Sequence, residues 1–261
     1  QAIKQSSNQA IKQSSMNTLF HSSLLALLIA CAAAKIDLGD AAPYAILAGS
    51  TITSAGAIGT DITGDIGLYP GSDLVGFPPA VHTGTKNIAN TAAFNAKASL
   101  TIAYNEAAGQ AVDTVLSNQD LGGMTLFPGV YKFAADAALN GVLTLDAQDD
   151  PEATWTFQVG SAMLFALNSQ VIFLHGFGNA DLVYWQVGSS ATIEGGATVE
   201  GNIMADQSIS ANTGASINGR LLARIAAVTM HTNTVVVPPV TVPAPAPQAA
   251  EVKTTHLRRT S

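Results

Sequence analysis

The pattern of apolar and small polar positions repeats in the second half of the chain. Residues 190–205 align without a gap on residues 208–223, an offset of 18 residues, and apolar positions meet apolar positions throughout. Gly196 coincides with Gly214 in this alignment. Three short strands joined by glycine-containing corners account for a period of this length. The repeat therefore predicts a stack of coils that share one core.

Related segments extend the stack in both directions along the chain. Residues 157–160 (FQVG) recur as 185–188 (WQVG), and residues 130–133 begin a similar segment before them. Residues 227–237 form the last turn, while residues 44–70 combine apolar runs with glycine turns. Residues 44–70 are therefore predicted to be a first coil, separated from the other coils by an insertion.

The insertion is an alanine-rich segment over residues 90–109. Alanine favours helix, Asn90 or Thr91 is placed to cap the beginning of a helix, and Gly109 is placed to end it. We expect this helix to brace the flank of the solenoid. The residues expected to guide its packing are a weak stripe of Phe94, Ala98, Thr101 and Asn105 and the bulky side chains Phe94, Leu100, Ile102 and Tyr104.

The two ends of the chain are not expected to join the solenoid. Residues 1–15 contain a repeated polar segment, and residues 16–34 resemble a secretory signal peptide whose apolar run is too short to span a bilayer. Cys31, the only cysteine, lies in that run, and a lipid anchor there is the alternative to ordinary cleavage. The proline-rich residues 238–261 predict an extended tail. A secreted protein with a solenoid domain over residues 35–237 follows.

Composition and charge narrow the function classes. Only 11% of the residues are charged, 48% are hydrophobic and 23 are glycine, which suits a well-buried β-rich fold with many tight turns. The formal net charge is −7. Because nucleic-acid binding requires clustered Lys and Arg, we expect no nucleic-acid partner, and no membrane partner once the signal segment is removed.

Candidate catalytic and metal-binding groups are scattered. The histidines lack the spacing of metal ligands: His21, His82, His175, His231 and His256. One acidic cluster around Pro151 could offer carboxylate oxygens to calcium, although a polar corner loop is the favoured interpretation; it consists of Asp146, Asp149, Asp150 and Glu152. Catalysis needs titratable groups that converge in a cleft. The sequence therefore predicts no enzyme, no cofactor and no metal site.

Several short motifs follow one another around the predicted helix: residues 44–48 (YAILA), 64–67 (GDIG), 103–109 (AYNEAAG), 126–131 (LFPGVY), 153–159 (ATWTFQV) and 217–220 (INGR). Together, over roughly residues 37–237, they resemble the ice-binding (antifreeze) proteins of cold-adapted fungi, bacteria and algae. The resemblance implies a mainly β fold, an irregular right-handed β-solenoid of about six coils and triangular section with one long α-helix along its side. It also implies that the first coil packs beside the last, and that a monomer adsorbs to ice through one flat face.

Alternation along the second strand of each coil predicts which residues form that face. The side chains expected to point inward are Ala137, Leu139, Met163, Phe165, Ala191, Ile193, Ile209, Ala211, Val228 and Met230. One outward column then consists of Asp136, Ala162, Ser190, Ser208 and Ala227, and the other of Ala138, Leu164, Thr192, Ser210 and Thr229. Thr51 and Thr53, on either side of Ile52, extend the two columns into the first coil.

Small, stiff side chains on stacked strands suit adsorption to a crystal, because β-branched residues have little freedom left to lose. Two residues depart from this pattern: Leu164 is bulky, and the strongly hydrated carboxylate of Asp136 could place its coil outside the contact area. Two other function classes stay open. An adhesive or surface-scaffold solenoid would use the proline-rich tail as a tether, and a carbohydrate-active β-helix would need acidic residues that converge on an outward groove.

Overall fold

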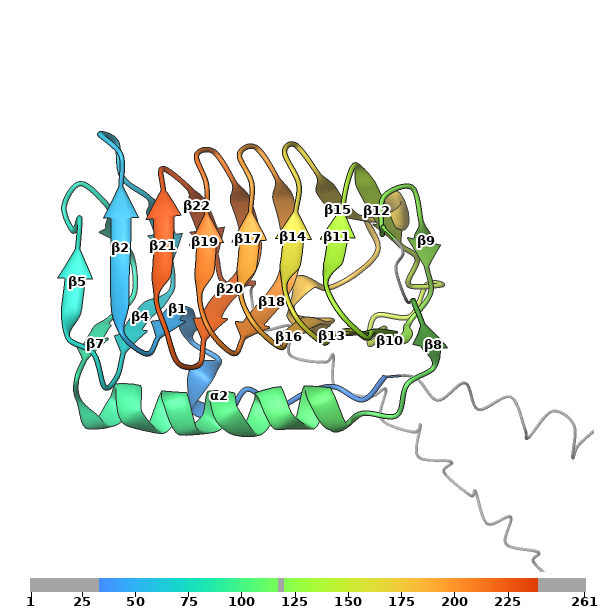
Figure 1. Cartoon of the computed structure of the whole chain (residues 1–261), viewed down its shortest axis with the longest axis horizontal. Coiled ribbons are helices and arrows are strands. Elements are labelled where there is room, and N and C mark those ends of the chain that lie inside the picture. The colour runs from blue at the N-terminus through green and yellow to red at the C-terminus, as the bar shows by residue number, and fades with distance from the viewer. Residues whose placement is uncertain (1–32, 117–119, 239–261) are drawn as a thin grey trace, which may run out of the picture.

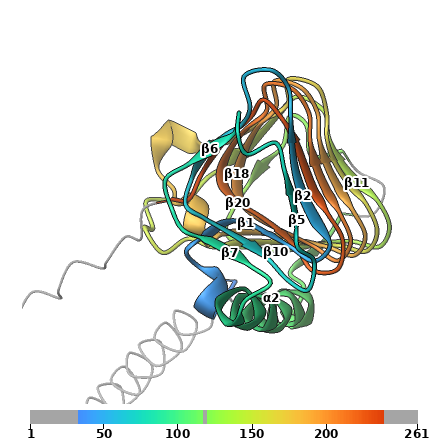
Figure 2. The same ribbon diagram turned by 90° about the vertical axis from the view of Figure 1, so that its left-hand side faces the viewer.

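The chain forms a stack of parallel β-coils with a helix along one side. The computed structural model describes residues 33–116 and 120–238, so the predicted leader, nearly all of the signal segment and almost the whole tail lie outside the described residues. Within them, strands form one 15-stranded and one 7-stranded sheet, and all the pairings are parallel. The section is triangular with three walls (Figure 2). The fold class implied by the resemblance is confirmed, while the number of coils and their right-handed sense stay predictions.

The 7-stranded sheet forms one wall by itself and faces the viewer in Figure 1. Its strands, in spatial order, are β11 (Ala137–Leu139), β14 (Met163–Phe165), β17 (Ala191–Ile193), β19 (Ile209–Ala211), β21 (Val228–His231), β2 (Thr51–Ala55) and β5 (Asp73–Val75). The order shows that the first coil lies beside the last, as the resemblance implied, because β2 pairs with β21.

The 15-stranded sheet bends around the other two walls. Beside the helix lie β8 (Thr114–Val115), β10 (Gly129–Phe133), β13 (Trp155–Val159), β16 (Val183–Val187), β1 (Tyr44–Ala48), β4 (Asp65–Leu68) and β7 (Lys86–Ile88). The third wall contains β9 (Thr125–Leu126), β12 (Val142–Leu145), β15 (Gln170–Phe173), β22 (Thr234–Val236), β3 (Asp61–Thr63) and β6 (Val81–His82). Both walls share β18 (Thr198–Ala205) and β20 (Ser216–Ala223), whose pairing over all eight residues confirms the 18-residue repeat.

Helix α2 (Thr91–Gly109) connects the two ends of the stack, and Asn90 caps it by accepting a hydrogen bond from the Ala93 amide (2.9 Å). Its 19 residues, at about 1.5 Å each, span about 28 Å. Seven strands spaced by about 4.8 Å span about 29 Å. The helix is thus as long as the sheet is wide, and it carries the chain from β7 at one end to β8 at the other (Figure 1). Three short 3-10 helices complete the described elements: η1 (Gly39–Ala41), η2 (Leu174–Gly176) and η3 (Ala180–Leu182).

The buried face of α2 differs from the prediction. Leu100 and Tyr104 are buried as expected, but Phe94 and Ile102 are 50% and 67% exposed, and Phe94 meets only the edge of Tyr69 at 5.2 Å between ring centroids. The predicted stripe was therefore wrong. The residues that face the solenoid are Ala93, Ala96, Lys97, Leu100, Ala103, Tyr104 and Ala107. Small alanines let the helix lie close to a wall that already projects large side chains: Tyr44, Leu47, Tyr184, Met204 and Leu222.

Lys97 fastens the helix to the last coils. Its buried Nζ donates hydrogen bonds to the carbonyl oxygens of Ala223 and Arg224 (2.6 Å to the latter). Burial, together with the nearby Arg224 guanidinium, lowers the pKa of Lys97 to about 7. At the C-terminal end of the helix, the Gln158 side chain donates hydrogen bonds to the carbonyl oxygens of Ala107 and Gln110, both at 2.9 Å. Hydrogen bonds in its first half and at its C-terminal end therefore hold α2 against the solenoid.

The core between the walls is apolar and continuous, and aromatic side chains from β10, β13, β14 and β16 pack together in it. Tyr131, Phe157 and Trp185 stack on adjacent strands, with ring centroids 5.6 Å and 4.0 Å apart. Phe165 of β14 meets Trp185 edge-on at 5.0 Å, which links the core to the 7-stranded sheet. Such packing resists displacement of the strands that lie above it.

Candidate functional site

The outward face of the 7-stranded sheet brings together residues from both ends of the chain. One column runs straight across the strands, because Thr53 pairs with Thr229, Thr229 with Ser210, and Ser210 with Thr192. The same column continues through Leu164 to Ala138. Every member is exposed or partly exposed. The structure therefore places all six of these predicted residues on one outward line.

The second column lies two residues earlier on each strand. Its members are Thr51, Ala227, Ser208, Ser190, Ala162 and Asp136, which all reach the surface. Backbone hydrogen bonds keep them in step: the amide of Ile209 donates to the carbonyl oxygen of Ala227 (2.9 Å), and the amide of Ala191 donates to that of Ser208 (3.0 Å). The intervening residues are buried, as predicted, from Ala137 to Ile52. The pleat of a half-buried sheet thus sets both columns.

Sequence reasoning missed two borders of this face. Strand β5 adds Asp73 and Val75, with Val75 53% exposed, beyond the first coil, because Thr51 pairs with Asp73 and Thr53 with Val75. It was missed because its outward Val75 is apolar and its inward Leu74 is only half-buried, so the strand does not show the alternation of buried apolar and outward polar positions. The second border is a third outward column, which lies two residues after the column of Thr53; its members are Ala55, His231, Asn212 and Glu194. Within it, the Asn212 side chain donates a hydrogen bond to the Glu194 carboxylate at 2.8 Å. Extending the predicted alternation by two residues along each strand would have located this column.

The face changes character at β14 and β11. Leu164 is 38% exposed beside small neighbours, and a shallow hollow of about 520 Å³ opens around it; the hollow is lined by Asp120, Asp136, Ala137, Ala138, Ala162, Met163, Leu164 and Thr192. The Asp120 carboxylate accepts hydrogen bonds from the amides of Gly122 (2.9 Å) and Asn140 (2.8 Å). Although burial opposes it, these bonds lower the pKa of Asp120. This end of the face is therefore uneven and negatively charged.

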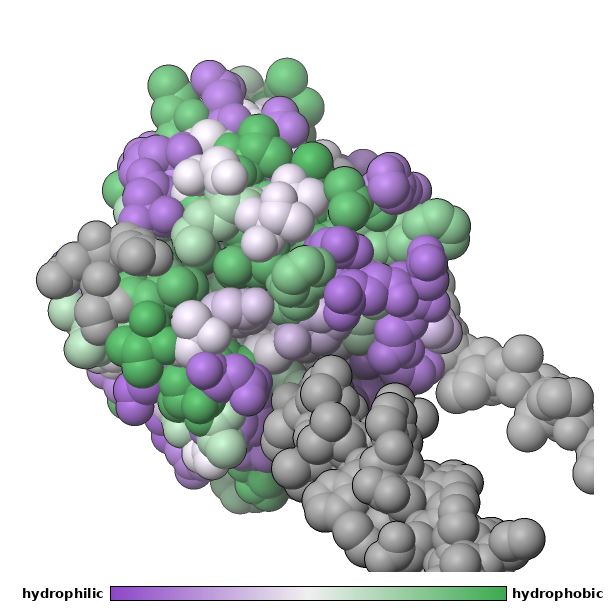
Figure 3. All heavy atoms as spheres, turned by 90° about the vertical axis from the view of Figure 1, so that its right-hand side faces the viewer, coloured by the Kyte–Doolittle hydropathy of each residue, from purple (hydrophilic) through white to green (hydrophobic). Residues whose placement is uncertain are grey.

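The end of the stack beyond β11 has no uniform character. Figure 3 shows hydrophilic and hydrophobic residues side by side there. Val115 and Phe127 are exposed at this end, and Asp113 is exposed beside them. This end therefore does not continue the columns of small side chains on the 7-stranded sheet.

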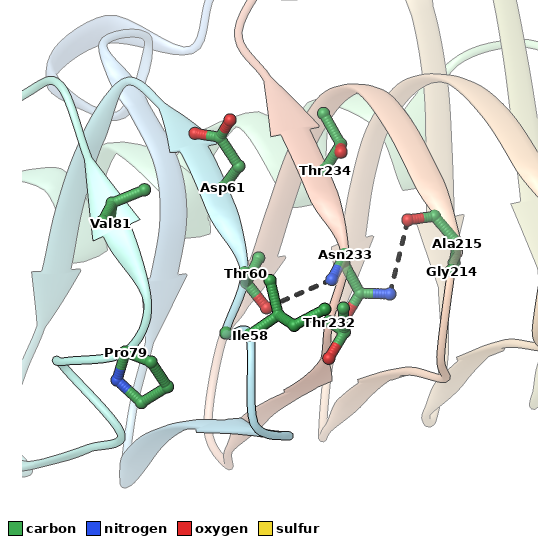
Figure 4. Close-up of a pocket in the computed structure, with 11 residues that line it drawn as sticks. Ile58, Thr60, Asp61, Pro79, Val81, Gly214, Ala215, Thr232, Asn233 and Thr234 are labelled. Atoms are coloured by element: carbon green, nitrogen blue, oxygen red, sulfur yellow. Dashed lines mark hydrogen bonds between the residues drawn. The ribbon is translucent and has the colours of Figure 1, made fainter.

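A separate pocket of about 340 Å³ lies where the first and last coils meet (Figure 4). Asp61 is the only titratable side chain that lines it. Asn233 forms two hydrogen bonds with other residues that line it: its backbone amide donates to the Thr60 hydroxyl (3.4 Å), and its side-chain amide donates to the carbonyl oxygen of Ala215 (3.3 Å). This pocket lacks the paired acids that a carbohydrate-active β-helix needs.

The acidic cluster around Pro151 forms hydrogen bonds within its own loop. The Asp146 carboxylate accepts from the Gln148 amide and the Asp150 carboxylate accepts from the Glu152 amide, both at 2.9 Å. In the part of the chain that the structure describes, no group of three or more His, Cys, Asp or Glu residues is arranged to hold a metal ion. The favoured interpretation, a polar corner loop, matches these contacts. Among the same residues, no helix is long and apolar enough to cross a membrane.

Comparison with known proteins identifies the family. The model of the Ice-binding-like family matches residues 46–236. An ice-binding protein of Nostoc sp. (strain HG1) is 44% identical over 199 residues, which cover 76% of this chain and 72% of that protein. The chain belongs to the ice-binding protein family. An ice-binding protein of Colwellia sp. is 33% identical over 219 residues, 78% of this chain and 84% of that protein.

Solved structures of ice-binding proteins are similar to this chain in both fold and sequence. One from an Antarctic biological consortium superposes with a TM-score of 0.77 at 41% identity, covering 81% of this chain and 95% of that one. Another, from the Antarctic ascomycete Antarctomyces psychrotrophicus, has a TM-score of 0.74 at 37% identity and covers 79% of this chain and all of that one. The resemblance to the ice-binding family that the sequence motifs suggested is confirmed.

Proposed function

We propose that this ice-binding family member adsorbs to ice through the outward face of its 7-stranded sheet, and thereby produces thermal hysteresis and inhibits recrystallisation. The observation that carries the proposal is the register of Thr53, Thr229, Ser210 and Thr192, four hydroxyl-bearing residues on four adjacent strands. The predicted residues Thr51, Ser190, Ser208 and Ala227 form a second line beside them, and Ala138, Ala162 and Leu164 extend the two lines towards β11.

The spacing of the columns gives this face its capacity to order water. Neighbouring strands are about 4.8 Å apart and alternate residues along a strand about 6.6 Å apart, so methyl and hydroxyl groups form a regular grid. Each immobilised water costs about 0–2 kcal/mol and returns hydrogen bonds. Affinity for a crystal therefore arises from many such sites that match at once, and it depends on their fixed relative positions.

Three features of the structure keep those positions fixed. Threonine is stiff about χ1, so its methyl and hydroxyl groups have little rotational freedom to lose on adsorption. Below the face, Ile52, Ile209 and Val228 are fully buried in the continuous core. The backbone ladder holds each strand to the next. A face with this support loses little entropy when it meets a lattice.

The proposal includes an ice surface as the partner, no catalytic activity, no nucleic-acid or membrane partner, and action as a secreted monomer. Carboxylates in the two outward columns are far apart, since Asp73 lies on β5 at one edge of the sheet and Asp136 directly precedes β11 at the opposite edge. Retaining glycosidases instead need two carboxyl groups about 5 Å apart, and inverting enzymes about 6.5–9.5 Å. Secretion is supported by the signal-like residues 16–34.

A tyrosine placed in the grid tests the proposal. Ser210→Tyr would lift the plane from its lattice, so we expect the fluorescently labelled variant to be excluded from a slowly growing ice hemisphere that incorporates the wild-type protein. Thr192→Tyr should behave in the same way. Thr234→Tyr, at an exposed position of β22 on a different wall, is the matched control and should be incorporated normally. Incorporation of a folded Ser210→Tyr variant at the wild-type level would refute the assigned face.

A further inference from the structure

The contact with ice occupies only part of the outward face. We propose that it is confined to a plateau on β17, β19, β21 and β2, and that the β11–β14 end stays in liquid water. This inference rests on the proposed function and narrows it. The plateau is defined by eight residues: Ser190, Thr192, Ser208, Ser210, Ala227, Thr229, Thr51 and Thr53.

The plateau is uniform in chemistry and in exposure. Seven of its eight side chains carry a hydroxyl group, and the eighth is Ala227. All eight are partly exposed, and the residues between them on each strand are buried. Its four strands are consecutive neighbours in the sheet. Water molecules held above this area therefore meet the same kind of group at each lattice step.

The grid is interrupted at β14. The position after Thr192 in its column is Leu164, a larger side chain with no hydrogen-bonding group, and the position after Ser190 in the other column is Ala162. The hollow of about 520 Å³ lies around this pair and extends from Thr192, at the edge of the plateau, to Ala138. Leu164 offers ordered water no hydrogen bond. A flat crystal surface resting on the plateau would leave the hollow unfilled.

Charge makes the same end unfavourable for ordered water. Asp136 is exposed, and hydrogen bonds from the side chain of Ser161 and the amide of Ala162 lower the pKa of Asp136, so it is ionised at neutral pH. Asp120 lines the same hollow and has a lowered pKa. Ionised carboxylates bind their own hydration water strongly, and moving them out of bulk water is costly. Geometry and charge therefore set the same boundary.

The plateau also has a consequence for assembly of the fold. Thr51 and Thr53 come from the first coil, and the other six residues come from positions 190–229. On this face, the two segments meet through the pairing of β2 with β21. Two amides of the first turn, Gly49 and Ser50, donate to the carbonyl oxygen of Ala226 at 2.9 and 3.2 Å. Docking of the first coil thus supplies a quarter of the contact residues.

A pair of truncations tests the boundary, because Thr192 and Leu164 are neighbours in one column on opposite sides of the plateau edge. Unlike a tyrosine, a shortened side chain cannot hold a crystal away from the rest of the face. Thermal hysteresis should fall in Thr192→Ala and should stay at the wild-type level in Leu164→Ala. The double variant Thr51→Ala/Thr53→Ala, at the other end of the plateau, should also lose hysteresis. Circular dichroism and melting temperature establish that each variant is folded.

The outcomes separate this inference from the proposed function. Loss of hysteresis in Leu164→Ala would overturn the boundary, because the contact would then extend to β14. Full hysteresis in Thr192→Ala and in Thr51→Ala/Thr53→Ala, combined with loss in Ser210→Tyr, would overturn the assigned plateau. Full hysteresis in Ser210→Tyr would instead refute the proposed face itself.

Discussion

Gly214 lies in the corner between β19 and β20, and we expect its replacement by valine to destabilise the protein. Its φ angle is +80°, in the left-handed region, and a Cβ atom placed there has its nearest neighbour 3.8 Å away, at the Gly196 amide nitrogen. The cost of a side chain is therefore backbone strain without a clash. For Gly214→Val this is about 1–3 kcal/mol. A domain of this size loses about 2–4 °C of melting temperature per kcal/mol.

The assay is thermal unfolding followed by circular dichroism. Gly109→Val is the matched control, because Gly109 ends helix α2 without a positive φ angle and a Cβ atom placed on it meets no other atom within 4 Å, so we expect no loss of stability there. Gly196→Val should cost more than Gly214→Val, since its φ angle is also positive and its Cβ would in addition displace the side-chain oxygen of Asn168. A wild-type melting temperature for Gly214→Val would refute the assignment of this corner.

Two further predictions concern the helix and the core. The pKa of Lys97 falls from 10.5 to about 7 on folding. Between these pH values the unfolded chain binds more protons than the folded protein, so the free energy of unfolding should rise with pH. Lys97→Met should flatten the rise in melting temperature between pH 7 and pH 9, and an unchanged slope would contradict this role of Lys97. Trp185 is fully buried and stacks on Phe157 at 4.0 Å, so Trp185→Ala should cost about 3–5 kcal/mol in urea unfolding, whereas a loss below about 1 kcal/mol would show that the stack is not part of the stable core.

The register of the coils could be predicted from the sequence because one side of every strand is buried. A slip of one residue would turn Ile209 and Ala211 outward and bury Ser210, so the apolar alternation specifies a single alignment. The same alternation located both outward columns. It also holds for the third column, which the prediction omitted because it assigned no outward position beyond the end of each short strand. Asn212 and His231 lie there.

The packing of the helix could not be predicted in this way. A large apolar side chain is normally a sign of the buried face, yet Ile102 points to solvent while Ala103 and Ala107 are fully buried. The wall under α2 supplies the bulk, so the helix contributes small residues. Its sequence alone does not contain that information, because the complementary side chains come from strands far away in the chain, such as Tyr184 and Leu222. Strand β5 was missed for a different reason, since Val75 is an apolar residue at an outward position and obscures the alternation.

Growth of a single ice crystal in a nanolitre osmometer, in a solution of the purified protein, shows whether the protein adsorbs to ice. We expect a gap between the melting and freezing temperatures and a faceted crystal within that gap, because a level grid of hydroxyl and methyl groups holds the protein on the growing surface. A rounded disc that grows as soon as the temperature falls below the melting point would contradict adsorption.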